Sequence, residues 1–454
     1  MTRRGGKVPP GRLGLPWLGE TTAIASNNHK FYTDRFDKYG PIFKTRLFGI
    51  NFVVLSGAEA FHRFATDPAI ERGNSDPISV EQIFLRSLAL EDGPEHRSRK
   101  DVMLHGIRTR EAITAYVPRM QRIMEATVDH WLADGTALVR PDLEMTSARL
   151  ATAMYTGLET EQHAQEIHDL NAAMRKAFST VPVAIPGTPY GKATKARDRM
   201  IAIIDEAIAR HRTGEYDDVI SRMLAAADEH GVPAEKLRGD LLHLIFASQG
   251  GYFVPLTLIT MALGEHPELM ERARREVLEV SPEGPVTMEQ LDRLVFLGQL
   301  SKELRRFFAM NSANFFGKAT QDLEVEGYRI PKGWGAIAAL HITMRSDDVY
   351  DDPDRFDPDR FLPDREAALP PGSYVPHGDG ERGGHRCPGE DVVTVAVKLY
   401  LTLLLRRATW DLPDQDLELT NELFPLPTSG LRVTFHPESA RSLTAPDAGN
   451  VTAG

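Results

Sequence analysis

The chain contains 454 residues, of which 42% are hydrophobic and 26% are charged, so it is long and apolar enough to bury a large core. A formal net charge of −11 argues against nucleic acid as a general partner. The single cysteine excludes internal disulfides and is consistent with a reducing cytoplasm.

The N-terminal segment carries no pattern of a signal peptide or a membrane anchor, because the basic residues 1–7 run into proline and glycine instead of an apolar stretch. Residues 31–39 have the pattern of a short amphipathic helix. Residues 42–47 and 51–55 alternate around Gly49, and this alternation predicts a β-hairpin.

Residues 80–90 form a mixed apolar stretch whose larger side chains are Ile83, Phe84 and Leu88. These side chains either line a ligand pocket or pack in the core. Residues 93–100 begin the next helix and are dense in cations although the protein is acidic, which indicates either a solvated basic face or a binding surface.

Helical periodicity recurs in five segments between glycine, proline or charged breaks, and three short alternating segments in the C-terminal half predict strands. The chain is therefore predicted to be mostly α, with a small sheet. The helical segments are residues 111–132, 143–156, 162–178, 192–212 and 219–227, and the strands are residues 323–330, 335–340 and 431–435.

Residues 241–263 are apolar over a length that could cross a membrane, but they contain His243, Gln249 and Pro255. These residues favour a buried internal helix. Two successive glycines, Gly250 and Gly251, cost about 1–2 kcal/mol relative to alanine. Either room is needed beside this helix, or the helix bulges because Pro255 removes a hydrogen bond.

Residues 288–308 predict a helix that carries Glu303 and Arg306 three positions apart on one face. Such a pair is usually a solvated ion pair of little energetic weight. Further on, a segment rich in aspartate and proline supplies a second candidate partner, Arg360.

Residues 376–390 form a glycine-rich loop with the only cysteine, Cys387, followed by Pro388 and the apolar residues 392–405. A proline at this position begins a helix. The helix dipole and the cations His385 and Arg386 favour the thiolate. Such a sulfur is a nucleophile, a redox sensor, a metal ligand or an inert buried thiol, and the glycines favour a ligand to a large flat group.

The order and spacing of four residues resemble the motifs of the cytochrome P-450 family. These residues are Glu303, Arg306, Arg360 and Cys387. The resemblance implies a triangular helical prism with small β-sheets, in which haem b lies between the I and L helices. It implies that Cys387 is the proximal ligand of the iron and that the other three form a buried structural triad. We expect one such domain over residues 1–436 and a disordered tail over residues 437–454.

Different parts of the chain resemble different branches of this family. Residues 9–19 resemble the proline-rich N-terminal segment, and residues 186–197 resemble the loop before the G helix in retinoid and plant sterol hydroxylases. Gly380 stands where that branch has phenylalanine, and the cysteine loop ends as in fatty-acid peroxygenases. The resemblance to subfamilies is therefore mixed.

The resemblance also assigns contacts to the cofactor. His96 and Lys100 match propionate-binding positions of the C helix. The arginine that the family places in the strand after the Glu303 helix is absent; Phe315 falls near that position, and Lys318 is the nearest cation. The expected cofactor-binding residues are Cys387, His385, His96, Lys100, Lys318 and Gly389.

The distal helix departs from the family. Oxygen activation usually relies on an acid followed by a Thr or Ser, and Gly250 and Gly251 stand at those positions. Ser248 and Gln249 either hold water there or bond to their own backbone. Ala247 joins Ile83, Phe84 and Leu88 as an expected substrate-pocket residue.

The resemblance implies a haem-thiolate monooxygenase that oxidises a hydrophobic small molecule, such as a terpenoid or polyketide of secondary metabolism. We expect a cytoplasmic monomer that takes electrons from a ferredoxin and its reductase. Of the cations at the C helix, Arg97 and Arg99 are expected to form a solvated face, and with Arg108 and Arg110 they offer a patch to an acidic ferredoxin.

Two other functions remain open. One is a peroxygenase using hydrogen peroxide, or a rearrangement enzyme, because neither needs the missing acid and alcohol. The Arg-Pro pair of fatty-acid peroxygenases is replaced by Val254-Pro255, so a free fatty acid is a poor candidate. A haem sensor or carrier is the remote alternative, and it needs no capped distal pocket.

Overall fold

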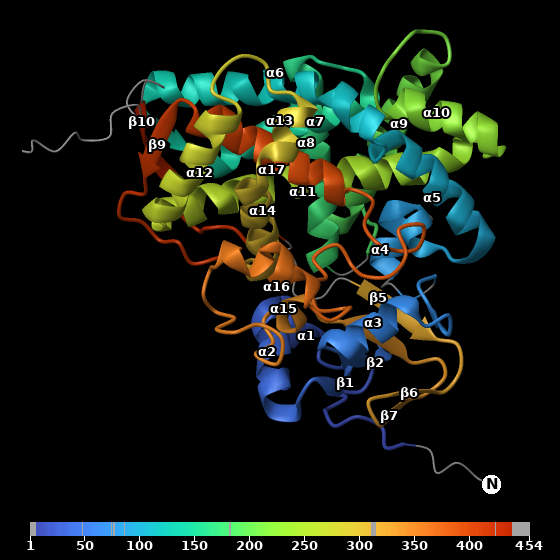
Figure 1. Ribbon diagram of the computed structural model, residues 1–454. Coiled ribbons are helices and arrows are strands. Elements are labelled where there is room, and N and C mark those ends of the chain that lie inside the picture. The colour runs from blue at the N-terminus through green and yellow to red at the C-terminus, as the bar shows by residue number, and fades with distance from the viewer. Residues whose placement is uncertain are drawn as a thin grey trace, which may run out of the picture.

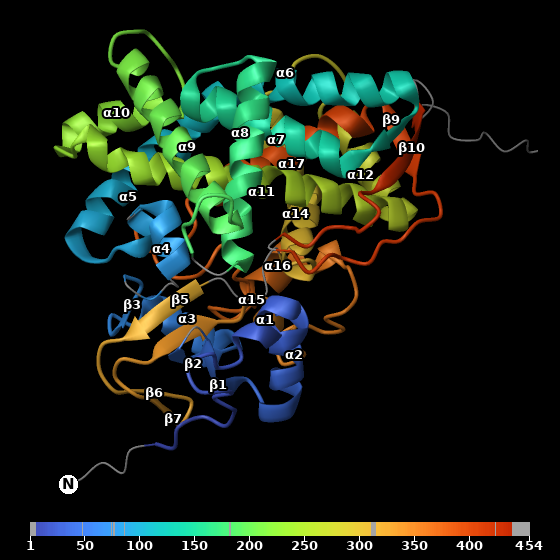
Figure 2. The same ribbon diagram turned by 180° about the vertical axis from the view of Figure 1, so that it is seen from behind.

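The computed structural model describes residues 6–437 except 48, 74, 76–77, 86, 181–182, 310–314 and 423. A large helical part lies against a smaller part that holds most of the β-structure, as Figures 1 and 2 show from opposite sides. The expected mostly helical fold with small sheets is confirmed. The expected tail lies outside the described residues from 438 onward, while Pro437 still belongs to the last strand.

The α-helices vary from single turns to spans of the whole helical part. Most of the long ones are amphipathic or buried and end at a glycine or a proline, as the breaks in the sequence predict. They are α1 Thr21–Ser26, α2 Asn28–Tyr39, α3 Ala58–Thr66, α4 Ile78–Phe84, α5 Gly93–Ile107, α6 Arg110–Asp134, α7 Val139–Thr156, α8 Glu161–Arg175, α9 Pro189–His211, α10 Val219–His230, α11 Leu237–Glu265, α12 Pro267–Val280, α13 Met288–Arg293, α14 Val295–Phe307, α15 Leu340–Met344, α16 Pro363–Ala367 and α17 Glu390–Leu405.

Three sheets accompany them, in the orders β1-β2-β8-β5-β3, β4-β10-β9 and β6-β7. Pairing is antiparallel except between β2 and β8, where Phe52 aligns with Gly335. The strands are β1 Ile42–Leu47, β2 Ile50–Leu55, β3 Ile70–Glu71, β4 Thr136–Leu138, β5 Phe315–Ala319, β6 Leu323–Val325, β7 Tyr328–Ile330, β8 Gly335–Ala338, β9 Ala408–Asp411 and β10 Arg432–Pro437.

Two predicted segments are divided in the structure. The segment 323–330 is a hairpin instead of one strand, because Glu326 and Gly327 both have positive φ, 45° and 78°, and turn the chain between β6 and β7. The segment 288–308 divides at Leu294 into α13 and α14. Glu303 and Arg306 lie on the second of these helices, so the division leaves their spacing intact.

The long helix α11 runs through the helical part and packs against α7, α14 and α17. It is apolar on almost all sides, as a helix enclosed by other helices must be. Its segment from Ala234 to Glu265 is long and apolar enough to cross a membrane, but 83% of its most apolar window is buried inside the protein. It serves as an internal helix, and it stays helical through Pro255.

Candidate active site

Cys387 lies at the end of the loop that precedes α17. The Cys387 N–H donates to the His377 carbonyl at 2.8 Å, and the sulfur accepts a hydrogen bond from the Gly389 N–H. Burial raises the pKa of the Cys387 thiol, and the Gly389 N–H and Lys100 only partly offset this. The loop therefore favours the thiolate only in part, and a bound metal ion would itself deprotonate the sulfur.

Arg305 and His377 fasten this loop to the neighbouring helices. Both side chains are buried, and the Arg305 guanidinium donates to His377 Nε2 at 2.8 Å and to Thr394 of α17 at 3.0 Å. Burial, together with the charge of Arg305, lowers the pKa of His377 well below its usual range. A neutral His377 can accept this bond, so α14, the loop and α17 form one rigid support. The sequence analysis missed both residues, although Arg305 adjoins Arg306.

The three predicted triad residues meet in the interior. Arg306 donates to both Glu303 oxygens at 2.7 and 2.8 Å, and both side chains are fully buried. Arg360 Nε lies 3.5 Å from Glu303 Oε1. Arg306 also donates to the Met344 and Pro353 carbonyls, so the triad ties α14 to the segment that precedes the cysteine loop.

A second polar cluster joins α5 to the cysteine loop. The rings of His96 and His385 stack at 4.2 Å, and His385 Nε2 lies 3.0 Å from Asp92 Oδ1. Burial would raise the pKa of Asp92, but hydrogen bonds from His385 and from the Gly73 and Arg72 N–H groups bring it to about 2. His96 Nε2 is buried and has no hydrogen-bond partner within the described residues.

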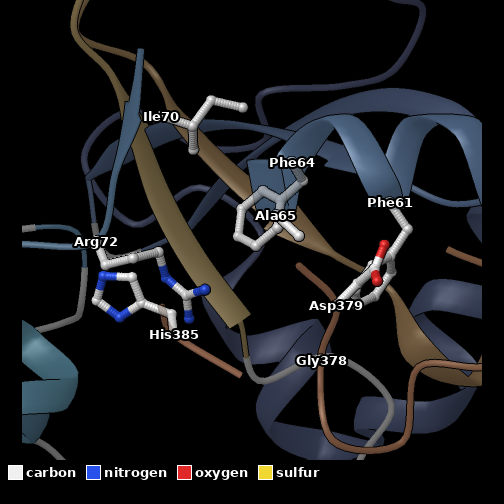
Figure 3. A pocket seen from close by; sticks show the side chains of 8 residues that line it. All are labelled: Phe61, Phe64, Ala65, Ile70, Arg72, Gly378, Asp379 and His385. Carbon is white, nitrogen blue, oxygen red and sulfur yellow. The ribbon is translucent and has the colours of Figure 1, made fainter. Parts of the chain in front are cut away.

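Two cations extend this cluster. Lys100 is buried and its Nζ donates to the Arg386 carbonyl at 2.6 Å, and burial lowers the pKa of Lys100 to about 8. Arg72 and His385 lie side by side in a pocket whose other wall includes Phe64 and Ile70, as Figure 3 shows. The sequence analysis missed Arg72, because it follows a two-residue strand far from any motif.

These donors fit the group that the sequence predicted. A thiol on a loop with a free approach past Gly389 suits an iron ligand, and an unpaired buried imidazole beside Lys100 and Arg72 suits an anionic carboxylate. Haem presents both an iron and carboxylates. The residues present therefore fit haem.

Lys318 does not join this cluster. It is exposed on β5, in a surface hollow with Glu71 and Lys332, and within the described residues no contact links it to His96, His385 or Lys100. Phe315 pairs with Ala338 through its backbone. The prediction that Lys318 replaces the absent arginine is not supported, and Arg72 occupies the place that would serve that purpose.

One face of α11, called the open face below, is only partly covered by other side chains. Ala247 is exposed and His243, Ser248 and Gly251 are half-buried, although the other side chains of this stretch are buried. Their spacing places them on one side of the helix. A Cβ at Gly251 would lie 3.6 Å from Val393 of α17, so this face looks toward the helix that follows Cys387.

The two glycines serve different purposes. A Cβ at Gly250 would lie 2.4 Å from the ring of Phe424, which comes from the C-terminal loop and packs edge-on against Phe253. The space left by Gly250 is therefore filled, while Gly251 borders the open face. Room beside the helix is therefore needed at Gly250, and an aromatic ring of the protein itself takes that room.

The two polar residues of this stretch, Gln249 and Ser248, also differ in whether they reach the open face. Gln249 is buried and its Nε2 has no partner within the described residues, so it does not reach the open face. Ser248 does, and its Oγ donates to the Ile245 carbonyl at 3.2 Å. The buried hydroxyl of Tyr155, from α7, hydrogen-bonds to Ser248 and Tyr252, which gives a cluster of three hydroxyls that the sequence analysis missed.

The expected substrate-pocket residues also divide. Ile83 and Leu88 are buried in the main core, as the core-packing alternative predicts. Phe84 stacks on His243 with 4.4 Å between the rings and meets Phe246 edge-on at 5.2 Å. Phe84 is also buried in this core, so of the four expected residues Ala247 alone is exposed, on the open face, and Phe84 reaches that face only through His243.

The predicted basic surface on α5 is smaller than expected. Arg99 is not solvated but buried, and it donates to both Asp240 oxygens at 2.9 and 2.6 Å. Arg108 pairs with Asp391 at 2.8 Å and Arg110 pairs with Asp292 at 2.6 Å. Of these four arginines only Arg97 is exposed without a carboxylate partner within the described residues.

Comparisons with known proteins agree with this geometry. A family model described as cytochrome P450 matches residues 9–435. A putative cytochrome P450 120 from Synechocystis sp. is 32% identical over 438 residues, covering 94% of this chain and 97% of the relative. The abscisic acid 8'-hydroxylase 1 of Oryza sativa subsp. japonica is 27% identical, covering 94% and 90%.

Solved structures show the same likeness. The retinoic acid bound cyanobacterial CYP120A1 is 30% identical, with a TM-score of 0.88 over 96% of this chain and 100% of that one. Cytochrome P450EX alpha (CYP152N1), in its wild-type form with myristic acid, has a TM-score of 0.78 over 95% and 100%, and its 21% identity supports a shared fold alone.

Proposed function

The chain belongs to the cytochrome P450 family and is an oxidoreductase of the monooxygenase type, and we propose that it hydroxylates an isoprenoid-like hydrophobic molecule with electrons from a ferredoxin. The observation that carries this proposal is the open face of α11 opposite the cysteine loop, with Ala247 and Gly251 on it and the aromatic ring of Phe84 at its edge. We also propose a cytoplasmic location and a role in secondary metabolism.

Haem b, when bound, supplies the activation of dioxygen with two electrons and two protons. Cys387 would ligate the iron. His96 Nε2, Lys100, His385 and Arg72 would hold the propionates, since they are the donors gathered beside the cysteine loop. Arg305 and His377 would keep the sulfur in place through the 2.8 Å bond from the Cys387 N–H to the loop.

Protons have to reach the open face without the usual acid and alcohol. We assign this task to the cluster of Tyr155, Ser248 and Tyr252. Burial raises the pKa of Tyr155 to about 12, so its Oη keeps its proton and donates or shares it instead of carrying a charge. Ser248 Oγ is the member on the open face, where it can order a water molecule.

The substrate class follows from the walls and from relatives. Phe84, Phe178 and Phe246 contact one another and give an aromatic wall at one end of the open face. The names of two relatives mention retinoic acid and abscisic acid, which are both isoprenoids. An apolar, elongated terpenoid therefore suits this pocket better than a small polar metabolite.

Peroxide-driven turnover is the second candidate, and the glycines favour it. Peroxide already carries both electrons and protons, so it does not need the side chains missing at Gly250 and Gly251. Against it, the position of the carboxylate-binding arginine holds Val254, which is fully buried and apolar. We propose that oxygen and ferredoxin are the main route and that peroxide is a lesser one.

The deciding experiment compares product yield on one substrate with hydrogen peroxide against yield with ferredoxin, reductase, NADPH and catalase. We expect measurable turnover in both, and peroxide leakage in the second whenever the substrate lacks a polar group near the oxidised carbon. If NADPH consumption is tightly coupled to product formation for all substrates, and catalase does not change the yield, the role given to the two glycines is contradicted. Absence of turnover with ferredoxin would replace the monooxygenase proposal by the peroxygenase one.

A further inference from the structure

His243 is a polar side chain at one end of an otherwise apolar face. It lies deep in the protein on α11, yet other side chains cover it only partly, because it lies on the open face. Phe84 covers one side of its ring at 4.4 Å with an interplanar angle of 18°. A half-covered imidazole has a free edge, and His243 shares its face of α11 with Ala247 and Gly251.

A hydrogen bond favours one of the two tautomers of the His243 imidazole. Ser87 Oγ lies 3.1 Å from His243 Nδ1, and Ser87 is fully buried. His243 is the one partner of this hydroxyl within the described residues, so the Ser87 proton is directed at Nδ1. Nδ1 is then the acceptor, and Nε2 carries the imidazole proton and is the donor on the open face.

The imidazole remains uncharged at neutral pH. Burial and the charge of Lys100 lower the pKa of His243 to about 4. Its surroundings agree with that state, because Phe84 and Phe246 are apolar, Asp240 is occupied by Arg99, and the ammonium of Lys100 is bonded to the Arg386 carbonyl. A neutral donor in an apolar setting suits a neutral acceptor, whereas an anion there would lack a counter-charge.

We propose that His243 Nε2 is the anchor for a carbonyl or hydroxyl oxygen at one end of the substrate, and that this contact decides which end enters first. The inference rests on the proposed function, whose substrate class it narrows to neutral oxygenated isoprenoids. Eight residues separate His243 from Gly251, which corresponds to about 12 Å along the helix. An oxygen held by His243 therefore lies at the end of the open face that is remote from Gly251.

The test uses four probes with one sesquiterpene skeleton: farnesene, farnesol, farnesal and farnesoic acid. Binding to the haem-loaded enzyme is measured by the spin-state change of the iron and by calorimetry. We expect farnesol and farnesal to bind about tenfold more tightly than farnesene, because an unpaired buried donor is costly. The affinity of farnesoic acid should exceed that of farnesene by less than the affinities of the two neutral oxygenated probes do.

Three variants separate recognition from structure. His243→Leu should bring farnesol and farnesal to within about twofold of farnesene while the carbon monoxide spectrum stays unchanged. His243→Gln keeps an N–H donor and should restore part of the preference. His105→Leu is the matched control, because His105 is exposed on α5 and its ring nitrogen bonds to the Asp101 carbonyl of its own helix.

Several outcomes would overturn the inference. Equal binding of all four probes by the wild type would reject the anchor and leave the proposed function standing. A resting spectrum of nitrogen-ligated iron that disappears in His243→Leu would show that His243 is an iron ligand. If none of the four probes binds, the isoprenoid class fails, and the anchor that rests on it fails as well.

Discussion

The two sides of the pocket are built from different kinds of contact. On the side of Cys387, buried ion pairs and backbone bonds hold most of the polar groups described above, as Glu303 and Arg306 illustrate at 2.7 Å. On the side of α11, the groups are small side chains and hydroxyls, and the buried Gly250 packs against a ring from the C-terminal loop, Phe424. Charge therefore determines the structure of one side and shape that of the other. Substitutions on the two sides should lower stability for different reasons.

The largest effect is expected where charge is buried. Glu303→Ala leaves Arg306 and Arg360 in the interior without their carboxylate, which typically costs about 3–5 kcal/mol. The variant should fail to fold with haem, as measured by urea unfolding and by haem content. Glu166→Ala is the control, because its pair with Arg199 is solvent-exposed and worth about 0–1 kcal/mol. A Glu303→Ala protein that folds and binds haem normally would show that the triad is not structural.

Removing the sulfur tests the same side without breaking an ion pair. In wild-type protein, the reduced carbon monoxide complex should show the red-shifted Soret band of thiolate ligation. Cys387→Ser should lose that band, while its far-ultraviolet circular dichroism should match the wild type. A band at the histidine-ligated position in fresh wild-type protein would refute the assignment of Cys387.

Substituting the two glycines tests the side defined by shape. Gly250→Ala collides with the Phe424 ring and should destabilise the protein by roughly 1–3 kcal/mol, because overpacking forces the ring to move. Gly251→Ala meets only Val393 at 3.6 Å and should stabilise α11 by up to about 1 kcal/mol. Unfolding by urea measures both values. In a Phe424→Ala background, Gly250→Ala should no longer lower the free energy of unfolding, while the effect of Gly251→Ala should stay the same. Equal effects of the two alanines in the wild-type background would contradict this account.

The smallest effect concerns pH. The pKa of Asp92 is lowered from 3.8 to about 2 in the folded protein, so the carboxylate contributes stability above pH 4 that is lost as pH falls through 2. Unfolding free energy should therefore decrease over this window in the wild type, and Asp92→Asn should lack this component. Asp101→Asn, an exposed carboxylate on α5, is the control. An identical pH profile for Asp92→Asn would show that the bond from His385 carries no weight.

The sequence predicted the side held by charge better than the side defined by shape, and the reason is physical. Glu303 and Arg306 are three residues apart on one helix, so their contact is local and legible in the sequence. Cys387 with Pro388 marks a helix start in the same way. The burial of Cys387, which raises the pKa of its thiol, could not be predicted in this way, because burial depends on the whole fold.

Residues that reach the pocket from distant segments could not be predicted. Tyr155 on α7 meets Ser248, and Phe424 in the C-terminal loop meets Gly250. Nothing near these aromatic residues in the sequence distinguishes them from core side chains. The absence of a side chain at Gly250 was visible in the sequence, but its cause lies on another element. Arg72 was missed and Lys318 was chosen for a related reason, since proximity in sequence to a motif is not proximity in space.

The contact between Phe424 and Gly250 also restricts how this enzyme could change over evolutionary time. An ancestor or descendant with an acid at position 250 cannot carry the ring of Phe424 in its present place, because even a Cβ would lie 2.4 Å from it. The two positions therefore form an epistatic pair, and the aromatic residue must be lost before the acid is gained. A lineage that returned to acid-assisted oxygen chemistry would pass first through a form without this contact, with altered packing of α11 preceding altered mechanism.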